Sequence, residues 1–296
     1  MLYLISLLFS SLYLIIVEGI DNSKLNITHN SIKTFLKKEH FAIGYHVIAP
    51  KYNLTSCYIG KSLSSITLGV FCYLYDEKKF LEKYKKVKNG AANRKICKSK
   101  NSYSSILNIA KQYSNENETE ILTNWTNLMI IREPVSRFLS GFVQLCVLNI
   151  GLTNNHPYCF NCKKDMKCFL KQLYNHIINL DNKLTEVDKF IMYHFYPQSW
   201  QCEYFKYKDN YKIILYTSDT NKFYNEYLLK LEESLVPNEK IKFIRYLIYN
   251  SKVIHSTSSK KITKDYKNRL LKDKYLMSLI NIIYYDDFNE FNLKTL

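Results

Sequence analysis

The sequence predicts an α/β domain, built on a central parallel sheet of four or five strands with helices on both faces. Short apolar runs at Leu128–Ile131 and Lys212–Tyr216 are typical of strands buried inside a parallel sheet. Segments with apolar residues three and four positions apart surround these runs and indicate helices. Because strands and helices alternate along the chain, a parallel sheet covered by helices is the expected architecture.

The N-terminal part of this domain begins with two short β-runs, at His46–Pro50 and Ser56–Gly60. A helix is expected over Ser62–Tyr75, where apolar residues recur every three or four positions. Ser62 or Ser64 is expected to cap it, because a serine oxygen can accept a hydrogen bond from the first free backbone N–H groups. Residues 76–124 are charged and weakly patterned, and are expected to be helical in part.

A second strand-to-helix transition is expected where Pro134 follows the Leu128–Ile131 strand. Proline suits the first turn of a helix, so a helix is predicted from Pro134 to about Leu148. Asp219 is expected to cap a helix that ends at Glu233. The remaining helices are expected at Met166–Leu180, Glu186–Phe195, Asn238–Tyr249 and Thr263–Tyr284.

Charge and composition limit the partners. The formal charge is +16, from 42 Lys and Arg against 26 Asp and Glu, which favours anionic partners such as nucleic acid, a membrane surface, a nucleotide or a sulfated glycan. An apolar fraction of 47% supports a large core. Only 7 Gly and 5 Pro exclude a collagen-like or low-complexity chain.

The N-terminus indicates entry into the secretory pathway. Residues Leu2–Val17 carry no charge, a length that suits the apolar core of a signal peptide and is short for a membrane span of about 20 residues. Both a cleaved signal peptide and a single-pass signal anchor remain open for residues 1–19. Residues 20–40 are polar and are expected to form a stem, followed by one domain over 41–296.

Two further features agree with a lumenal or secreted protein. Eight cysteines, an even number, fit disulfides in an oxidising compartment. Acceptable N-glycosylation sequons begin at Asn26, Asn53, Asn117 and Asn124. This location makes nucleic acid an unsuitable partner.

The junction after the first strands has the chemistry of a phosphate site. Lys61-Ser62-Leu63-Ser64-Ser65 leads directly into a helix, whose N-terminal N–H groups and dipole favour an anion. Lys61 adds a mobile positive charge, and the serines add hydroxyl donors. The junction is P-loop-like in this respect, although the GxxxxGK[ST] pattern is absent. A serine-rich helix cap without a ligand is the structural alternative.

The junction after Leu128–Ile131 has the same character. Arg132 stands at the strand end, where a planar guanidinium can bind a phosphate through two hydrogen bonds. Ser140 lies about two helical turns further on, and Arg137 and Gly141 lie near the same face. Gly141 inside a helix costs about 1 kcal/mol relative to Ala, so it is expected to allow a close approach.

These residues carry a resemblance to a known family. REPVSRFLSGF at 132–142 resembles the 3′-phosphate signature of Golgi-type carbohydrate sulfotransferases, R-D/E-P-x-x-R-x-x-S-x-F. The segment APKYNLTSCYIGKSLSSITLGVFCYLYD at 49–76 resembles their 5′-phosphosulfate loop, especially in the chondroitin 4-sulfotransferase-like and nematode-type branches. HFYPQSWQC at 194–202 and the closing YYDDF at 284–288 follow in the family's order. Gly60 departs from the proline that the family has before the lysine.

The resemblance implies a sulfotransferase fold, 3′-phosphoadenosine 5′-phosphosulfate (PAPS) as co-substrate without a metal, and a glycan or proteoglycan acceptor. It implies that Lys61 contacts the bridging oxygen of the phosphosulfate. The serines of the Lys61 loop would bind the 5′-phosphate, and Arg132 and Ser140 the 3′-phosphate. The residues expected to contact PAPS are Lys61, Ser62, Ser64, Ser65, Arg132, Arg137 and Ser140. The expected location is the Golgi lumen, as a type II anchored protein, or outside the cell.

The base that removes the acceptor proton is left open by the sequence. His194 is the first candidate because it opens a segment that matches a His-bearing block of the family. A half-buried histidine in an aromatic cluster is the structural alternative. His46 is the second candidate, with Glu133 or Asp76 the third.

A kinase-like nucleotide-binding enzyme and a non-catalytic binding protein are the two alternative classes of protein. A kinase-like nucleotide-binding enzyme lacks support, since neither GxxxxGK[ST] nor an acidic pair for Mg²⁺ is evident. A secreted, non-catalytic nucleotide- or glycan-binding protein that kept the fold remains an alternative.

Four cysteines, at 146, 159, 162 and 168, are expected to pair locally as disulfides, with a zinc site as the less favoured interpretation.

Overall fold

The computed structural model describes residues 44–84, 97, 100–150, 159–181, 188–250 and 261–294, which all belong to one compact unit spanning 37–296. The expected leader, the stem and the Asn26 sequon lie outside these residues, so the boundaries at 19 and 40 stay predictions. Within the ranges just given, no helix combines the length and the apolar character needed to cross a bilayer.

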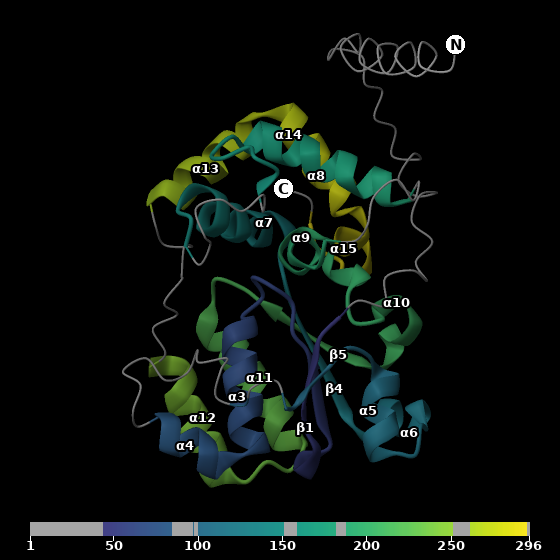
Figure 1. Cartoon of the computed structure of the whole chain (residues 1–296). Coiled ribbons are helices and arrows are strands. Elements are labelled where there is room, and N and C mark those ends of the chain that lie inside the picture. Colours follow the sequence, from purple (N-terminus) through teal and green to yellow (C-terminus); the bar gives the residue numbers. More distant parts are fainter. Residues whose placement is uncertain are drawn as a thin grey trace, which may run out of the picture. The chain divides into compact units, whose positions relative to one another are not determined.

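The described residues form a five-stranded sheet in the order β3-β1-β2-β4-β5 (Figure 1). Strands β2, β4 and β5 are parallel neighbours, whereas β1 is antiparallel to β2 and β3. The predicted α/β fold is therefore confirmed, with two of the predicted strands, β2 and β4, side by side. The strands are β1 (His46–Ala49), β2 (Leu54–Cys57), β3 (Ser102–Tyr103), β4 (Thr126–Arg132) and β5 (Tyr211–Tyr216).

The antiparallel direction of β1 has a simple cause. Only residues 50–53 connect β1 to β2, as a short helical turn (Pro50–Tyr52) followed by Asn53 with a φ of 46°. A link this short allows a hairpin, while a parallel pair needs a crossover of about a dozen residues or more. The hairpin also starts β2 at Leu54, two residues before the predicted start.

Helices cover both faces of the sheet (Figure 1). Alternate residues of β4 point to opposite faces, so that Leu128 and Ile130 join one core cluster and Met129 and Ile131 join the other. The first cluster is closed by α3 (Ser64–Tyr75), α4 (Glu77–Tyr84), α11 (Thr220–Glu233) and α12 (Asn238–Asn250). The second is closed by α5 (Ile106–Tyr113), α6 (Glu118–Asn124) and α10 (Tyr204–Tyr207).

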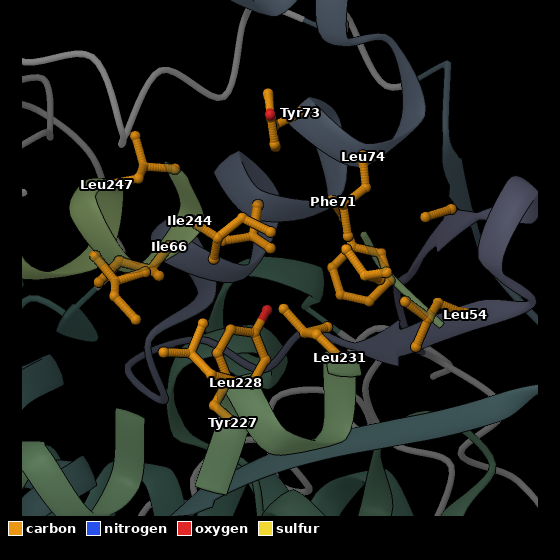
Figure 2. Packing of buried hydrophobic residues seen from close by; sticks show 14 of the residues in the cluster. Leu54, Ile66, Phe71, Tyr73, Leu74, Tyr227, Leu228, Leu231, Ile244 and Leu247 are labelled. Carbon is orange, nitrogen blue, oxygen red and sulfur yellow. The ribbon is translucent and has the colours of Figure 1, made fainter. Parts of the chain in front are cut away.

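Figure 2 shows the first cluster where three helices meet over β2. The cluster contains Ile66 and Phe71 of α3, Leu228 and Leu231 of α11 and Ile244 of α12. These side chains are almost fully removed from water, and each buried aliphatic or aromatic side chain contributes about 1.5–3 kcal/mol. Asp219 caps α11 by accepting from the Lys222 N–H, as predicted.

A second group of helices follows the carboxyl end of β4. Helix α7 packs against α9 and α13, and α14 packs against α8 and α15. The predicted helix from Thr263 is broken in two, because the Asp273 carboxylate caps α14 through the Tyr275 and Leu276 N–H groups. The helices are α7 (Pro134–Phe142), α8 (Met166–Asp181), α9 (Lys189–Phe195), α13 (Lys261–Lys272), α14 (Lys274–Ile283) and α15 (Tyr285–Glu290).

Gly141 provides the close approach expected of it. A Cβ atom at this position would lie 2.8 Å from the ring of Phe195 in α9. The α7 helix ends one residue later and continues as a π-helical turn (Val143–Val147), so the helix expected to reach Leu148 changes its geometry at Val143.

One buried polar residue makes the fold sensitive to acid. His46, at the start of β1, is fully buried, and neither ring nitrogen has a hydrogen-bond partner among the described residues. Burial lowers the pKa of His46 from 6.5 to about 4. The unfolded chain thus takes up a proton near pH 6.5 that the folded chain resists until about pH 4, so acid favours unfolding across this interval.

We expect the free energy of unfolding to be unaffected by His46 above pH 6.5 and to fall by up to about 3 kcal/mol on acidification to pH 4. His46→Leu fills a similar volume without a titrating group, so its stability should decline less over this interval and should be no lower at pH 7. Denaturant unfolding at a series of pH values measures both proteins. Parallel pH profiles would contradict the assignment.

Candidate active site

The two predicted phosphate junctions meet in the structure. β2 and β4 are parallel neighbours, and the chain leaves both strands at the same edge of the sheet. The Arg132 Nη1 atom donates to the backbone oxygen of Lys61 at 3.2 Å. The two junctions are therefore in direct contact.

The N-cap residue of α3 makes no capping hydrogen bond with its side chain. Lys61 and Leu63 have φ values of 71° and 58°, and Leu63 occupies the N-cap position without a capping side chain. The prediction that Ser62 or Ser64 caps this helix was wrong, because the Ser62 hydroxyl donates to Gln198 Oε1 instead. An uncapped N-terminus keeps backbone N–H groups directed at the junction, where an anion is favoured.

Helix α7 differs from α3 in this respect. Both carboxylate oxygens of Glu133 accept from its first N–H groups, from Val135 and Ser136, each at 2.7 Å. The N-terminus of α7 is thus capped by the chain itself. Glu133, a third candidate for the base, is engaged in this cap.

The Lys61 side chain is held by a residue that the sequence analysis did not single out. Its Nζ donates to Gln144 Oε1, in the π-helical turn that follows α7. The ammonium group is partly exposed. This contact connects the loop after β2 to the end of the helix after β4.

Arg132 lies against an aromatic ring at the ends of β4 and β5. Its guanidinium carbon lies 5.3 Å from the centre of the Tyr216 ring, and the two residues pair across the strands. Burial lowers the pKa of Arg132, yet a guanidinium stays charged at neutral pH. Ser140, on α7, is 9% exposed.

Arg137 points into the protein. The residue is fully buried, and its guanidinium donates to the backbone oxygens of Gly60, Tyr196 and Tyr193 at 3.0, 2.8 and 3.2 Å. These contacts fix the residue before Lys61 to the α9 segment. Gly60 lies so close to α9 that a Cβ atom would be 2.3 Å from the Tyr193 oxygen, which explains why no proline stands before this lysine.

Gln198 and Asp287 hold the two junctions together through hydrogen bonds. Neither residue was among the site residues predicted from the sequence. Gln198 Oε1 accepts from the Arg132 N–H and the Ser62 hydroxyl, each at 2.8 Å, while its Nε2 donates to the Arg132 oxygen at 2.8 Å. The fully buried Asp287 carboxylate accepts four hydrogen bonds from Gln198 and Ser199. Gln198 lies in the HFYPQSWQC segment and Asp287 in the YYDDF segment. The resemblance of these two segments to the family was the sequence feature that could have indicated a role for both residues.

His194 lies in the last turn of α9, partly exposed, and its Nδ1 lies 2.9 Å from the Phe190 oxygen. A carbonyl oxygen only accepts, so in the neutral imidazole Nδ1 carries the proton and Nε2 is the basic nitrogen. That is the form a general base requires. His46, the second candidate, is fully buried and has no surface for an acceptor.

The family model described as the sulfotransferase family matches residues 45–294. The chain belongs to the sulfotransferase family. The resemblance inferred from the two junctions is thereby confirmed, and the protein is a sulfotransferase.

Three proteins of the nematode Caenorhabditis elegans are similar to this sulfotransferase. Carbohydrate sulfotransferase chst-1 is 29% identical over 254 residues, covering 84% of this chain and 75% of that protein. Putative sulfotransferase vep-2 is 30% identical over 226 residues, covering 75% and 68%. The uncharacterised protein C18B2.2 is 28% identical over 276 residues, covering 92% and 74%. No solved structure matches significantly.

Four disulfides hold the segments of the sulfotransferase around its site. Cys146–Cys159 and Cys162–Cys168 pair locally as predicted, so these sulfurs do not form the zinc site considered above. Cys57–Cys202 joins the end of β2 to the segment that carries Gln198. Cys72–Cys97 anchors residue 97 to α3.

We expect Asp287→Asn to destabilise the sulfotransferase by about 2–4 kcal/mol, because the amide NH₂ would face N–H donors of Gln198 or Ser199. Loss of the hydrogen bonds to Asp287 should also weaken binding of adenosine 3′,5′-bisphosphate. The neighbouring Asp286→Asn is the matched control, since one carbonyl oxygen still accepts from the Trp200 indole. Denaturant unfolding and calorimetric titration measure both effects, and equal behaviour of the two variants would refute the role of Asp287.

Proposed function

We propose that this sulfotransferase transfers a sulfuryl group from PAPS to a hydroxyl group of a glycan in the secretory pathway. The observation that carries the proposal is the contact of the two anion-binding junctions through Arg132 and the Lys61 backbone. One junction offers an uncapped helix N-terminus and an ammonium group, and the other offers a guanidinium at a strand end. Two phosphates on one adenosine match this pair of sites. The name of chst-1 supports a carbohydrate acceptor.

The loop before α3 is proposed to hold the phosphosulfate. The backbone N–H groups at the start of α3, with the Ser64 and Ser65 hydroxyls, are proposed to bind the 5′-phosphate. Lys61 is proposed to neutralise the charge that builds on the bridging oxygen as the sulfuryl group departs. Ser62 is 1% exposed and donates to Gln198, so we assign it a positioning role.

The Arg132 junction is proposed to hold the 3′-phosphate. The Arg132 guanidinium is kept in place by Tyr216 and by the Lys61 oxygen, so little side-chain freedom is lost on binding. Ser140 would add a hydroxyl donor. Arg137, buried among three carbonyl oxygens, is proposed to position the loop without contacting the nucleotide. His194 is proposed to accept the proton of the acceptor hydroxyl.

Localisation follows from the same proposal. Four disulfides fit an oxidising compartment. We therefore place the enzyme in the Golgi lumen or outside the cell, with residues 1–19 as its signal peptide or anchor.

The most direct test of the whole proposal is transfer of labelled sulfate from PAPS to a panel of desulfated glycans. Binding of adenosine 3′,5′-bisphosphate without transfer to any glycan would contradict it.

Arg132→Ala should weaken binding of adenosine 3′,5′-bisphosphate by about 10- to 100-fold, the equivalent of losing a charge-assisted contact of about 1.5–3 kcal/mol. The 3′-phosphate does not change charge during transfer, so kcat at saturating PAPS should change less. Calorimetric titration measures the affinity. Arg245→Ala, which removes an exposed arginine of α12, is the control. Unchanged affinity in Arg132→Ala would overturn the 3′-phosphate assignment.

Lys61→Ala should lower kcat by about 100-fold or more, because its contact strengthens only as charge develops on the leaving oxygen. Affinity for the bisphosphate should fall much less. Lys61→Arg should recover little, since a planar fork does not replace a compact ammonium. Lys51→Ala is the control, because Lys51 is exposed in the turn at the opposite end of β2. Steady-state kinetics with saturating PAPS decide the matter, and a normal kcat in Lys61→Ala would exclude this role.

A further inference from the structure

We propose that a pocket between the start of the sheet, α3 and α9 binds the acceptor as a sugar unit of an acidic glycan; this inference rests on the proposed function. The pocket has a volume of about 360 Å³ and is lined by residues from four separate segments. That volume lies at the small end of ligand sites, which range over about 300–1,000 Å³, and suits a short saccharide segment.

Three tyrosine rings form an aromatic wall. The rings of Tyr45 and Tyr58 are stacked with centroids 5.6 Å apart, and the Tyr193 ring stands edge-on to both at 6.3 Å. Such rings combine a flat apolar face with a polar hydroxyl at the rim. A pyranose has the matching shape, with a C–H face and a rim of hydroxyl groups.

Polar groups line the rest of the pocket. The Tyr58 hydroxyl and Ser102 Oγ lie 3.1 Å apart, and Asn101 is held by donating to the Ile48 oxygen. Hydroxyl and amide groups at fixed positions suit the many hydroxyls of a saccharide. Few such groups in an aromatic pocket are enough to fix a ligand's orientation.

The charge of the pocket favours an acidic sugar. Lys189, the exposed first residue of α9, lines it, and none of the lining residues that the structure describes is acidic. In the part of the chain that the structure covers, no carboxylate pairs with Lys189. A carboxylate or sulfate on the glycan would supply that partner. The net charge of +16 would help to draw such a chain to the enzyme.

The pocket includes the proposed base and is joined by hydrogen bonds to the loop that carries Lys61. His194 lines it, with Nε2 as the basic nitrogen. One guanidinium, that of Arg137, donates both to the oxygen of Tyr193 in the wall and to that of Gly60 beside Lys61. The wall residue Tyr58 precedes Lys61 by three positions in the chain. A hydroxyl held in this pocket is therefore positioned relative to both the base and the Lys61 loop.

The test compares Tyr45→Ala and Lys189→Gln with the wild-type enzyme. The acceptors are an unsulfated hexasaccharide of alternating uronate and N-acetylhexosamine, and the same hexasaccharide with its carboxyl groups reduced to alcohols. We expect Tyr45→Ala to raise KM about tenfold for both acceptors. Lys189→Gln should raise KM for the uronate form alone. The affinity for adenosine 3′,5′-bisphosphate should be unchanged in both variants.

Tyr246→Ala and Lys242→Gln are the matched controls, because both residues are exposed on α12 and neither lines the pocket. Wild-type KM values in both pocket variants, or no transfer to the hexasaccharide by an enzyme that sulfates other glycans, would overturn the pocket assignment alone. Failure of the wild-type enzyme to bind the bisphosphate would instead refute the proposed function. The two failures are thus distinguishable.

Discussion

The site depends on one buried side-chain amide. The Oε1 atom of Gln198 accepts hydrogen bonds from the Ser62 hydroxyl at one junction and from the Arg132 N–H at the other. Its Nε2 group donates to the Arg132 oxygen and to the Asp287 carboxylate. The contacts of Arg132 with Lys61 and of Arg137 with Gly60 join the same two junctions. With this amide in place, the spacing between the two junctions is a property of the folded core, so the two-phosphate ligand proposed above would meet a site that is already assembled.

Two opposite charges lie fully buried behind this amide, and each is balanced locally. Burial raises the pKa of Asp287 and lowers that of Arg137, while the attraction between the two groups opposes both changes. The carboxylate accepts four hydrogen bonds and the guanidinium donates to three carbonyl oxygens. Because removing one charge takes away an attraction that opposes the cost of burying the other, we expect substitutions here to be costly even though neither group is proposed to contact a substrate.

Local pattern explains what the sequence predicted well, and distance along the chain explains what it did not. The strands β4 and β5 and the helices α3, α8, α11 and α12 follow from apolar spacing, which each segment carries by itself. The meeting of Lys61 and Arg132 followed from parallel strands opening at one edge. Gln198, however, lies 66 residues after its partner Arg132 and 89 residues before its partner Asp287. No local pattern around these residues predicts that they interact. Arg137 was expected to contact PAPS, because a sequence does not reveal that three backbone carbonyl oxygens surround its guanidinium.

The Cys57–Cys202 disulfide has a practical consequence for producing the enzyme. It closes a loop of 145 residues, for which the chain-entropy estimate of stabilisation is about 5 kcal/mol. It also joins the strand before the Lys61 loop to the segment that holds Gln198, so the same covalent bond supports both stability and the assembled site. Recombinant material made in a reducing cytoplasm would lack this crosslink. Preparations from an insect-cell or yeast secretory host are therefore the appropriate starting point for biochemistry and crystallisation.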